Sequence, residues 1–559
     1  MMMYNHIMSM FLFFLPGILL IFSDEFRKKG LCELLIYIIA FSLSFFVLFP
    51  WFIKPLGLSL LGSTYLIFMI SIVLVLAGIK KLHIKEIIFD KNELVILCIF
   101  MILMILRLVP MVLQIAPAGA DMSMHSYIAR LIYDNDGIPD SYKPLLPIKN
   151  FGTYPTGFPS LSALISLTSN ISVLRSSLFT ACLAHALIAF GLYLLLLGFF
   201  DKNTAAATSI FTGFLTRNPQ WVIRWGGNPT VLAIFFLIIA VALIIGQKDR
   251  PSVIKSILAS LALAATLVTH TIIFYSGMIL ISILLALYLR SHKEYWSAAI
   301  WGFLSMAMFL LPFLISYRPV VTRFAIDFSR VWQNIYIKSV LYDIIGGLPF
   351  IAVSLVGLII LLHKNRPIAK VFLITTLVNI LLIINYKFWI LPFSFILYPD
   401  RVAMLLIIPL SIFAAPAISR MISNKNKFYL VPLVLLGSIY YFYFYLYNSY
   451  SMVAVTQADI NAFGWIDKTI SKKAVIMNNY GDAGLWIPAI IGRSITTPAS
   501  EPIHGDELNA GLLKLRPNYI YIGSKAVYPI VIRSDDLDKK PWKYKRIYSE
   551  GGAQVWKIL

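Results

Sequence analysis

Charged residues are scarce in this 559-residue sequence: 13% are Asp, Glu, Lys or Arg, 59% are apolar, and the mean hydropathy is +0.82. Soluble domains carry about a quarter charged residues, so this composition excludes an ordinary soluble protein and indicates a polytopic membrane protein. Cysteine is also rare. The three cysteines, Cys32, Cys98 and Cys182, all fall within predicted membrane spans, which excludes a disulfide framework in the segments outside the membrane.

Several motifs of soluble catalysts are missing as well. The sequence contains no CxxC pair, no histidine pair at zinc-ligand spacing and no glycine-rich phosphate loop. Use of ATP or a nucleotide sugar on the cytoplasmic side therefore has no support in the sequence. The net charge of +21 comes from basic residues that flank the spans, so membrane lipid rather than nucleic acid is the expected partner.

Apolar runs long enough to cross a bilayer recur along the first 447 residues. A transmembrane helix needs about 20 apolar residues, and this criterion predicts an α-helical polytopic membrane protein with about 11–14 transmembrane helices. The candidate spans are residues 7–22, 31–52, 60–79, 94–115, 173–200, 204–216, 228–246, 253–269, 272–290, 296–317, 344–363, 369–386, 401–421 and 428–447.

Lysine and arginine are distributed unevenly between the loops. Alternate short loops, beginning with residues 23–30 and 80–93, hold most of them, and such basic loops remain in the cytoplasm. This asymmetry predicts a multi-pass plasma-membrane protein in which the loops 116–172 and 318–343, and the tail from about residue 448, lie outside the cytoplasm.

The composition changes near residue 448. We expect residues 1–93 to form additional N-terminal transmembrane helices, residues 94–447 a transmembrane core, and residues 448–559 a small extracytoplasmic α/β domain. The pattern of this last part predicts a helix over 458–470, strands over 473–478 and 515–523, and a closing hairpin over 545–548 and 554–558.

The loop 116–172 carries the densest group of polar residues. Asp121 is the first carboxylate after the span 94–115, and apolar residues follow it at positions 124, 127, 128, 131 and 132. This spacing predicts an amphipathic interfacial helix on which Asp121 and His125 share one face. Asp121 could instead serve as the cap of that helix, and Asp134 and Asp136 favour a turn.

The segment Asp121-x-x-x-His125-x-x-x-Ala-Arg130, followed by about ten further spans, resembles the GT-C superfamily of membrane glycosyltransferases. The later segment Asp482-Ala-Gly-Leu-Trp-Ile is similar to the Trp-Trp-Asp-Tyr-Gly region of oligosaccharyltransferase catalytic subunits, although Asn478 and Asn479 replace the tryptophans. The resemblance implies inverting transfer of a sugar from a polyprenyl-phosphate-linked donor to an acceptor hydroxyl that we leave unidentified. Asp121 would act as the general base.

The sequence departs from the metal-dependent members of this group. Oligosaccharyltransferases hold a divalent metal with further acidic residues in outer loops, whereas the loop 317–343 has only Asp327 and Asp343 among four basic residues. A basic loop suits a lipid phosphate better than a cation. We therefore expect a metal-independent enzyme without a cofactor, like the mannosyl- or aminoarabinosyl-transferases. The alternative is a metal held by Asp121 and His125.

Cationic, aromatic and polar residues on the predicted outer side, in loops or at the ends of spans, are candidate contacts for the sugar or its phosphate, because guanidinium groups bind phosphate oxygens in pairs. The simpler interpretations are headgroup-facing arginines, an Arg401–Asp400 pair, and a polar turn at His270 that divides the overlong run 253–290. The candidate contacts are His125, Arg130, Lys143, Tyr154, Arg217, Arg224, Trp225, Asn228, His270 and Arg401.

Two other functions compete with sugar transfer. A lipid-linked glycan ligase or polymerase would be expected to have a large arginine-rich outer loop, and 318–343 is short. A transporter or flippase of lipid-linked sugars would be expected to carry charges deep within its spans, and these spans hold almost none apart from Arg107.

Overall fold

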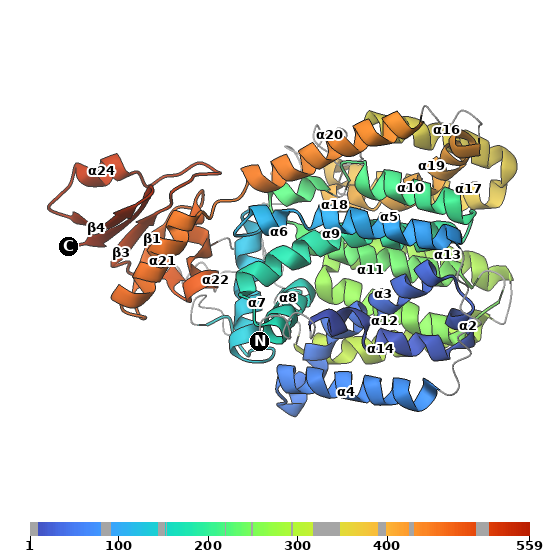
Figure 1. Cartoon of the computed structure of the whole chain (residues 1–559), viewed down its shortest axis with the longest axis horizontal. Coiled ribbons are helices and arrows are strands. Elements are labelled where there is room, and N and C mark those ends of the chain that lie inside the picture. The colour runs from blue at the N-terminus through green and yellow to red at the C-terminus, as the bar shows by residue number, and fades with distance from the viewer. Residues whose placement is uncertain are drawn as a thin grey trace.

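Long apolar helices packed side by side form most of the protein, and a small sheet lies beyond one end of this bundle (Figure 1). The computed structural model describes residues 9–79, 91–143, 151, 154–218, 220–247, 250–291, 295–316, 347–388, 399–423, 430–498 and 514–559. The predicted loop 318–343 lies outside these ranges.

Within the described ranges, eight helical segments are long and apolar enough to cross a membrane, and three shorter apolar helices accompany them. This agrees with an integral membrane protein at the lower end of the predicted number of spans. The principal helices of the bundle are α3 (Leu31–Ile53), α4 (Leu60–Gly78), α5 (Lys91–Arg107), α9 (Val173–Leu197), α10 (Lys202–Phe214), α11 (Asn228–Ile245), α12 (Val253–Thr269), α13 (Thr271–Ser291), α14 (Tyr295–Ser316), α16 (Leu348–Lys364), α17 (Arg366–Phe388), α18 (Pro399–Met404), α19 (Ile407–Ser423) and α20 (Leu430–Ser451).

Two of the predicted spans differ from a single membrane-crossing α-helix in the residues that the structure describes. The described part of the span 7–22 ends in a 3-10 helix, η1 (Gly17–Phe22). The span predicted at 204–216 corresponds to α10, whose 13 residues reach about 20 Å, less than the bilayer core of about 30 Å. Its buried threonines and alanines pack against α9, so α10 is a packing element of the bundle.

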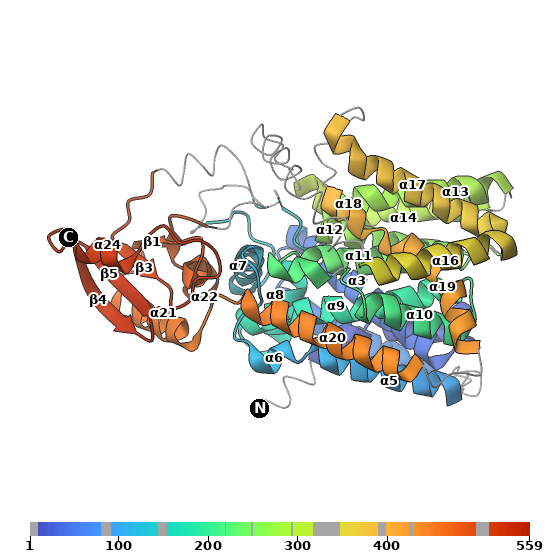
Figure 2. The same ribbon diagram turned by 90° about the horizontal axis from the view of Figure 1, so that it is seen from above.

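The bundle is layered from its centre outward (Figure 2). Helix α11 is buried along its whole length and α9 almost as fully, whereas α4, α5, α14 and α17 expose most of their apolar surface. Because exposed apolar helices need a hydrocarbon environment, this pattern indicates a rim that faces lipid around a protein core.

The N-terminal helices are tied to the core at the bundle end away from the sheet. The Glu93 carboxylate is buried, lies 2.5 Å from Lys202 Nζ, and accepts a hydrogen bond from the backbone N–H of Cys32. Gly30 leaves room for this group, since a Cβ there would lie 1.7 Å from the carboxylate. The first helices therefore belong to the folded body of the protein.

At the opposite end, the hairpin between α3 and α4 supports the long loop 116–172. The backbone N–H of Leu61 donates to Asp136 Oδ1 at 2.9 Å, and Ser59 bonds to the other carboxylate oxygen. Lys54 Nζ lies 3.1 Å from Asp140. The turn predicted around Asp136 is present, with a φ of +45° at that residue, and it also caps α4.

The C-terminal region forms a five-stranded sheet in the order β2-β1-β3-β5-β4, with β1 parallel to both of its neighbours and β4 and β5 antiparallel. The predicted helix and strands are confirmed, whereas the short strand β2 was not expected. The elements are α21 (Gln457–Thr469), β1 (Val475–Asn478), β2 (Ser494–Ile495), β3 (Tyr519–Ile522), β4 (Tyr544–Glu550) and β5 (Ala553–Ile558).

Asp482, in the segment similar to the oligosaccharyltransferase motif, serves the local fold of this domain. Its carboxylate accepts hydrogen bonds from the backbone N–H groups of Gly484 at 2.7 Å and Gly523 at 2.8 Å, and from the Asn479 amide. Burial raises the pKa of Asp482 to about 6. The Asn479 side-chain oxygen in turn accepts from the backbone of Val531 and Ile532.

We predict that Glu93→Gln lowers the thermal stability of the purified protein, because the amide keeps one acceptor but loses the charge that faces Lys202. Since Lys202 is 40% exposed, the expected loss is only about 1–2 kcal/mol. Asp24→Asn is the control. It removes the ion pair that the exposed Asp24 carboxylate forms with Arg27, and it should change the melting temperature little. Equal melting temperatures for the two variants would contradict this role of Glu93.

Candidate functional site

Asp121 is the first residue of α7 (Asp121–Asp134), a helix at the bundle end beside the C-terminal domain (Figures 1 and 2). The helix dipole favours a negative charge in this first turn. The cap position is occupied by Ala120, and no side-chain capping bond is found there. The alternative prediction that Asp121 caps this helix is therefore wrong.

Two glycines bring the start of α7 against the segment before α11. Gly119 and Gly226 have φ values of +90° and +97°, which side chains rarely adopt. A Cβ on Gly119 would lie 2.2 Å from the Gly226 nitrogen, and one on Gly226 would lie 2.8 Å from the Met122 nitrogen. The backbone N–H of Asp121 donates to the Trp225 carbonyl at 3.1 Å. The two segments thus lie in direct backbone contact.

Trp225 connects this junction to a basic residue more than 170 positions later in the chain. The guanidinium carbon of Arg401 lies 4.0 Å from the centroid of the Trp225 indole, and Arg401 also forms the predicted pair with Asp400. A guanidinium stacked on an aromatic face is held in a defined plane. The Arg401 side chain is 20% exposed, so it is not enclosed in the packed core.

His270 occupies the predicted break in the long apolar run, between α12 and α13. The break lies close to the start of α8 (Gly157–Ser169), because a Cβ on Gly157 would lie 2.3 Å from the Thr269 hydroxyl. His270 lies within electrostatic range of both Arg401 and His125. The polar turn therefore faces the same region as α7 and α18.

His125 is buried one turn after Asp121. Its ring centroid is 5.4 Å from that of Tyr154 and 6.0 Å from that of Phe158. Burial lowers the pKa of His125 to about 3, so the imidazole is neutral at physiological pH. Among the described residues, no three His, Cys, Asp or Glu side chains are grouped as metal ligands.

Six predicted site residues are thus brought together from five segments of the chain. They are Asp121, His125, Tyr154, Trp225, His270 and Arg401.

Four other predicted contacts have different surroundings. Arg130 bonds to Asp134 at 2.9 Å and donates to the Ile490 carbonyl of the C-terminal domain. Arg224 has an exposed side chain, and its carbonyl accepts the Tyr528 hydroxyl at 2.8 Å. These two residues therefore lie where the C-terminal domain docks. The remaining two are Arg217, which stacks on Phe444 of α20, and Lys143, which is exposed.

Asn228, the last predicted contact, points to a polar cluster that the sequence did not reveal. Its side-chain oxygen lies 3.0 Å from His185 Nε2, and both residues are buried. Arg107 donates to the Gly213 carbonyl at 2.9 Å and lies 4.7 Å from the Tyr445 ring centroid. The His185 ring also packs against Tyr445. No sequence signal connected His185 with Tyr445, because they come from α9 and α20.

No family model matches the sequence, and no curated protein matches it. Several solved structures resemble it in fold, among them the following three. The Archaeoglobus fulgidus oligosaccharyltransferase complex with Zn and sulfate has 13% identity and a TM-score of 0.55, covering 76% of this chain and 67% of its own. AglB from the same organism, in complex with an inhibitory peptide and a dolichol-phosphate, has 12% identity and a TM-score of 0.53. The match covers 77% of this chain and 69% of the AglB chain. ArnT from Cupriavidus metallidurans, bound to undecaprenyl phosphate, has 13% identity and a TM-score of 0.52. The match covers 83% of this chain and 97% of the ArnT chain.

The contact between Gly119 and Gly226 leads to a prediction. Gly226→Ala should destabilise the protein by about 1–3 kcal/mol, because the new methyl group meets the Met122 nitrogen and the residue must keep a positive φ. Gly57→Ala is the matched control, since Gly57 has a φ of +62° but nothing within 4 Å of an added Cβ. Thermal unfolding of both variants measures the difference. Equal losses of stability would mean that the positive φ alone accounts for the effect, and would contradict a role for the close contact with Met122.

Proposed function

We propose that this chain, which has the fold of the GT-C membrane glycosyltransferases, moves a sugar from a polyprenyl-phosphate-linked donor to an acceptor hydroxyl, with inversion and on the extracytoplasmic side. The observation that carries the proposal is that the N-terminus of α7, which bears Asp121, bonds to the backbone of Trp225, on whose ring Arg401 stacks, while the polar turn at His270 lies within electrostatic range of Arg401. All three lie at one end of a lipid-facing bundle.

The reaction requires a proton acceptor on one side of the sugar and charge stabilisation on the other. In an inverting displacement the acceptor oxygen attacks the anomeric carbon, and the carrier phosphate leaves with the electron pair of the broken bond. Asp121 takes the proton of the attacking hydroxyl. Arg401 stabilises the negative charge that develops on the phosphate, since its plane is already fixed by Trp225.

The neutral imidazoles suit sugar hydroxyls. Nδ1 of His125 and Nδ1 of His270 are buried and meet no hydrogen-bond partner among the described residues. Buried polar nitrogens of this kind cost free energy unless something pairs with them. In the proposal they bond to the sugar or to the phosphate, and the Tyr154 ring packs beside them.

A carrier lipid fits the chemistry of this site and of its structural neighbours. Two of the similar structures contain a polyprenyl-type phosphate, dolichol-phosphate in AglB and undecaprenyl phosphate in ArnT. The proposal extends this donor class to the present chain. It assigns no metal: among the described residues, the groups that connect to the start of α7 are imidazoles and the Arg401–Asp400 pair.

Asp121→Asn is the direct test of the general base. Transfer from radiolabelled polyprenyl-phosphate sugars to endogenous acceptors in native membranes should fall by about 10²–10⁴-fold, because the amide cannot accept the hydroxyl proton. Asp140→Asn, on the same loop but at an exposed position, should keep near-normal transfer. A correctly folded Asp121→Asn variant with full activity would remove Asp121 as the base.

Arg401→Gln tests the phosphate contact. We expect kcat/KM for the lipid-linked donor to fall roughly 10–100-fold, the loss of one charge-assisted hydrogen bond. Arg401→Lys should restore only part of this loss, because an ammonium neither stacks nor binds two oxygens at once. Arg224→Gln is the control, since that side chain is exposed. An unchanged kcat/KM in Arg401→Gln would contradict the assignment.

A further inference from the structure

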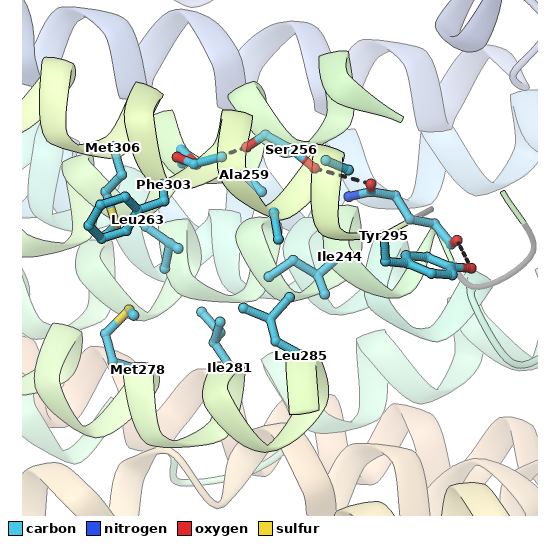
Figure 3. A pocket seen from close by; sticks show the side chains of 15 residues that line it. Ile244, Ser256, Ala259, Leu263, Met278, Ile281, Leu285, Tyr295, Phe303 and Met306 are labelled. Atoms are coloured by element: carbon cyan, nitrogen blue, oxygen red, sulfur yellow. Dashed lines mark hydrogen bonds between the residues drawn. The ribbon is translucent and has the colours of Figure 1, made fainter. Parts of the chain in front are cut away.

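A half-enclosed apolar cavity lies between α13 and α14, with α11 and α12 as its floor (Figure 3). The cavity volume is about 140 Å³, and one side of the cavity is open. Met278, Ile281 and Leu285 line it from α13, and Phe303 and Met306 from α14. These positions repeat at helical spacing, so one face of each helix forms a wall.

The cavity opens toward lipid. Phe303 lines it and is nevertheless 67% exposed, and its neighbours Ile300 and Leu304 are more than half exposed as well. Helix α14 approaches α12 closely at Gly302, where the Gly302 carbonyl accepts a hydrogen bond from the Ser260 hydroxyl at 2.6 Å. The two helices are therefore fixed at this contact, and the space beside it faces the hydrocarbon region.

Only one end of the cavity is polar. The Tyr295 hydroxyl donates to the Gln247 carbonyl at 2.8 Å, and the Ser256 hydroxyl lies 3.1 Å from the Gln247 side-chain oxygen (Figure 3). Ser256 is 14 residues before His270, which is about 20 Å along the helix. The polar end is therefore near the membrane face opposite Asp121, given a bilayer core of about 30 Å.

Cations stand beside this polar end. Lys255 directly precedes Ser256, and its Nζ donates to the Gly246 carbonyl at 3.0 Å, at the end of α11. Its Nζ also forms an ion pair with Glu25 at 3.8 Å. Arg250 follows on the connecting turn and is exposed. Trp296, exposed at the start of α14, is a residue type that favours the headgroup level.

We propose that this cavity binds one chain of an anionic glycerophospholipid from the leaflet opposite the transfer site, with the headgroup beside Lys255 and Arg250. The apolar walls accommodate the acyl chain, and the two cations favour a negative headgroup. A donor held at Asp121 would bring its phosphate to the other end of the bundle. The polarity of the cavity thus assigns it to a lipid of the opposite leaflet, and the site is independent of sugar transfer.

Retention of lipid by the full-length protein tests this proposal. The protein is reconstituted in nanodiscs with equimolar phosphatidylglycerol and phosphatidylcholine, extracted in mild detergent and examined by native mass spectrometry. About one phosphatidylglycerol should remain on each chain. Ala299→Phe, which fills the cavity from α14, should reduce this retention at least fivefold, whereas Ser297→Phe on the exposed side of the same helix should not.

The charge contribution is tested separately. Lys255→Gln with Arg250→Gln should lower the preference for phosphatidylglycerol over phosphatidylcholine by roughly fivefold per cation. Lys364→Gln, an exposed cation at the end of α16, is the control and should leave the preference unchanged. Equal retention by Ala299→Phe and Ser297→Phe would overturn the proposal, and so would a retained polyprenyl lipid or a lack of headgroup preference. Repeating the measurement on Asp121→Asn keeps the result separate from enzymatic activity.

Discussion

The backbone contact between Gly119 and Gly226 is the constraint on which the candidate site depends. It brings the first turn of α7 against the segment that precedes α11, with the Asp121 N–H on the Trp225 carbonyl. Trp225 then holds Arg401 in a stacked orientation. The start of α7 and the Arg401 guanidinium are therefore linked through the backbone and the ring of Trp225. Rigid supports of this kind limit the reorganisation that a reaction would otherwise require.

Several parts of the protein converge on that contact. The carbonyl of Met452, just after α20, accepts the Gly119 N–H at 3.2 Å, so the connection to the C-terminal domain is part of the support. Asn228 begins α11 immediately after Gly226 and Gly227, and His185 holds it from α9. The hairpin between α3 and α4 steadies the other end of α7 through Asp136. Both the N-terminal helices and the C-terminal domain thus contribute to the position of Asp121.

Local features could be predicted because local forces decide them. The amphipathic spacing after Asp121 gave a helix, the length of the run 253–290 required a break at His270, and alternation in the tail identified β3 and β5. The predicted span at 204–216 was wrong, because apolar composition alone does not distinguish a short packing helix from a membrane span. Arg130 and Arg224 were predicted as substrate contacts, yet they lie where the C-terminal domain docks.

The sequence by itself determined the membrane class of the protein and the helical pattern, including the helix that Asp121 begins, because hydropathy and helical periodicity act over short stretches of chain. It could not identify which of the candidate cations lies beside Asp121. Only the tertiary structure decided that Arg401 stacks on Trp225, whose carbonyl accepts the Asp121 N–H, and that Arg130 contacts the C-terminal domain. The physical reason is that these contacts join segments up to about 280 residues apart, and their approach depends on packing at positions such as Gly119 that carry no side-chain signal.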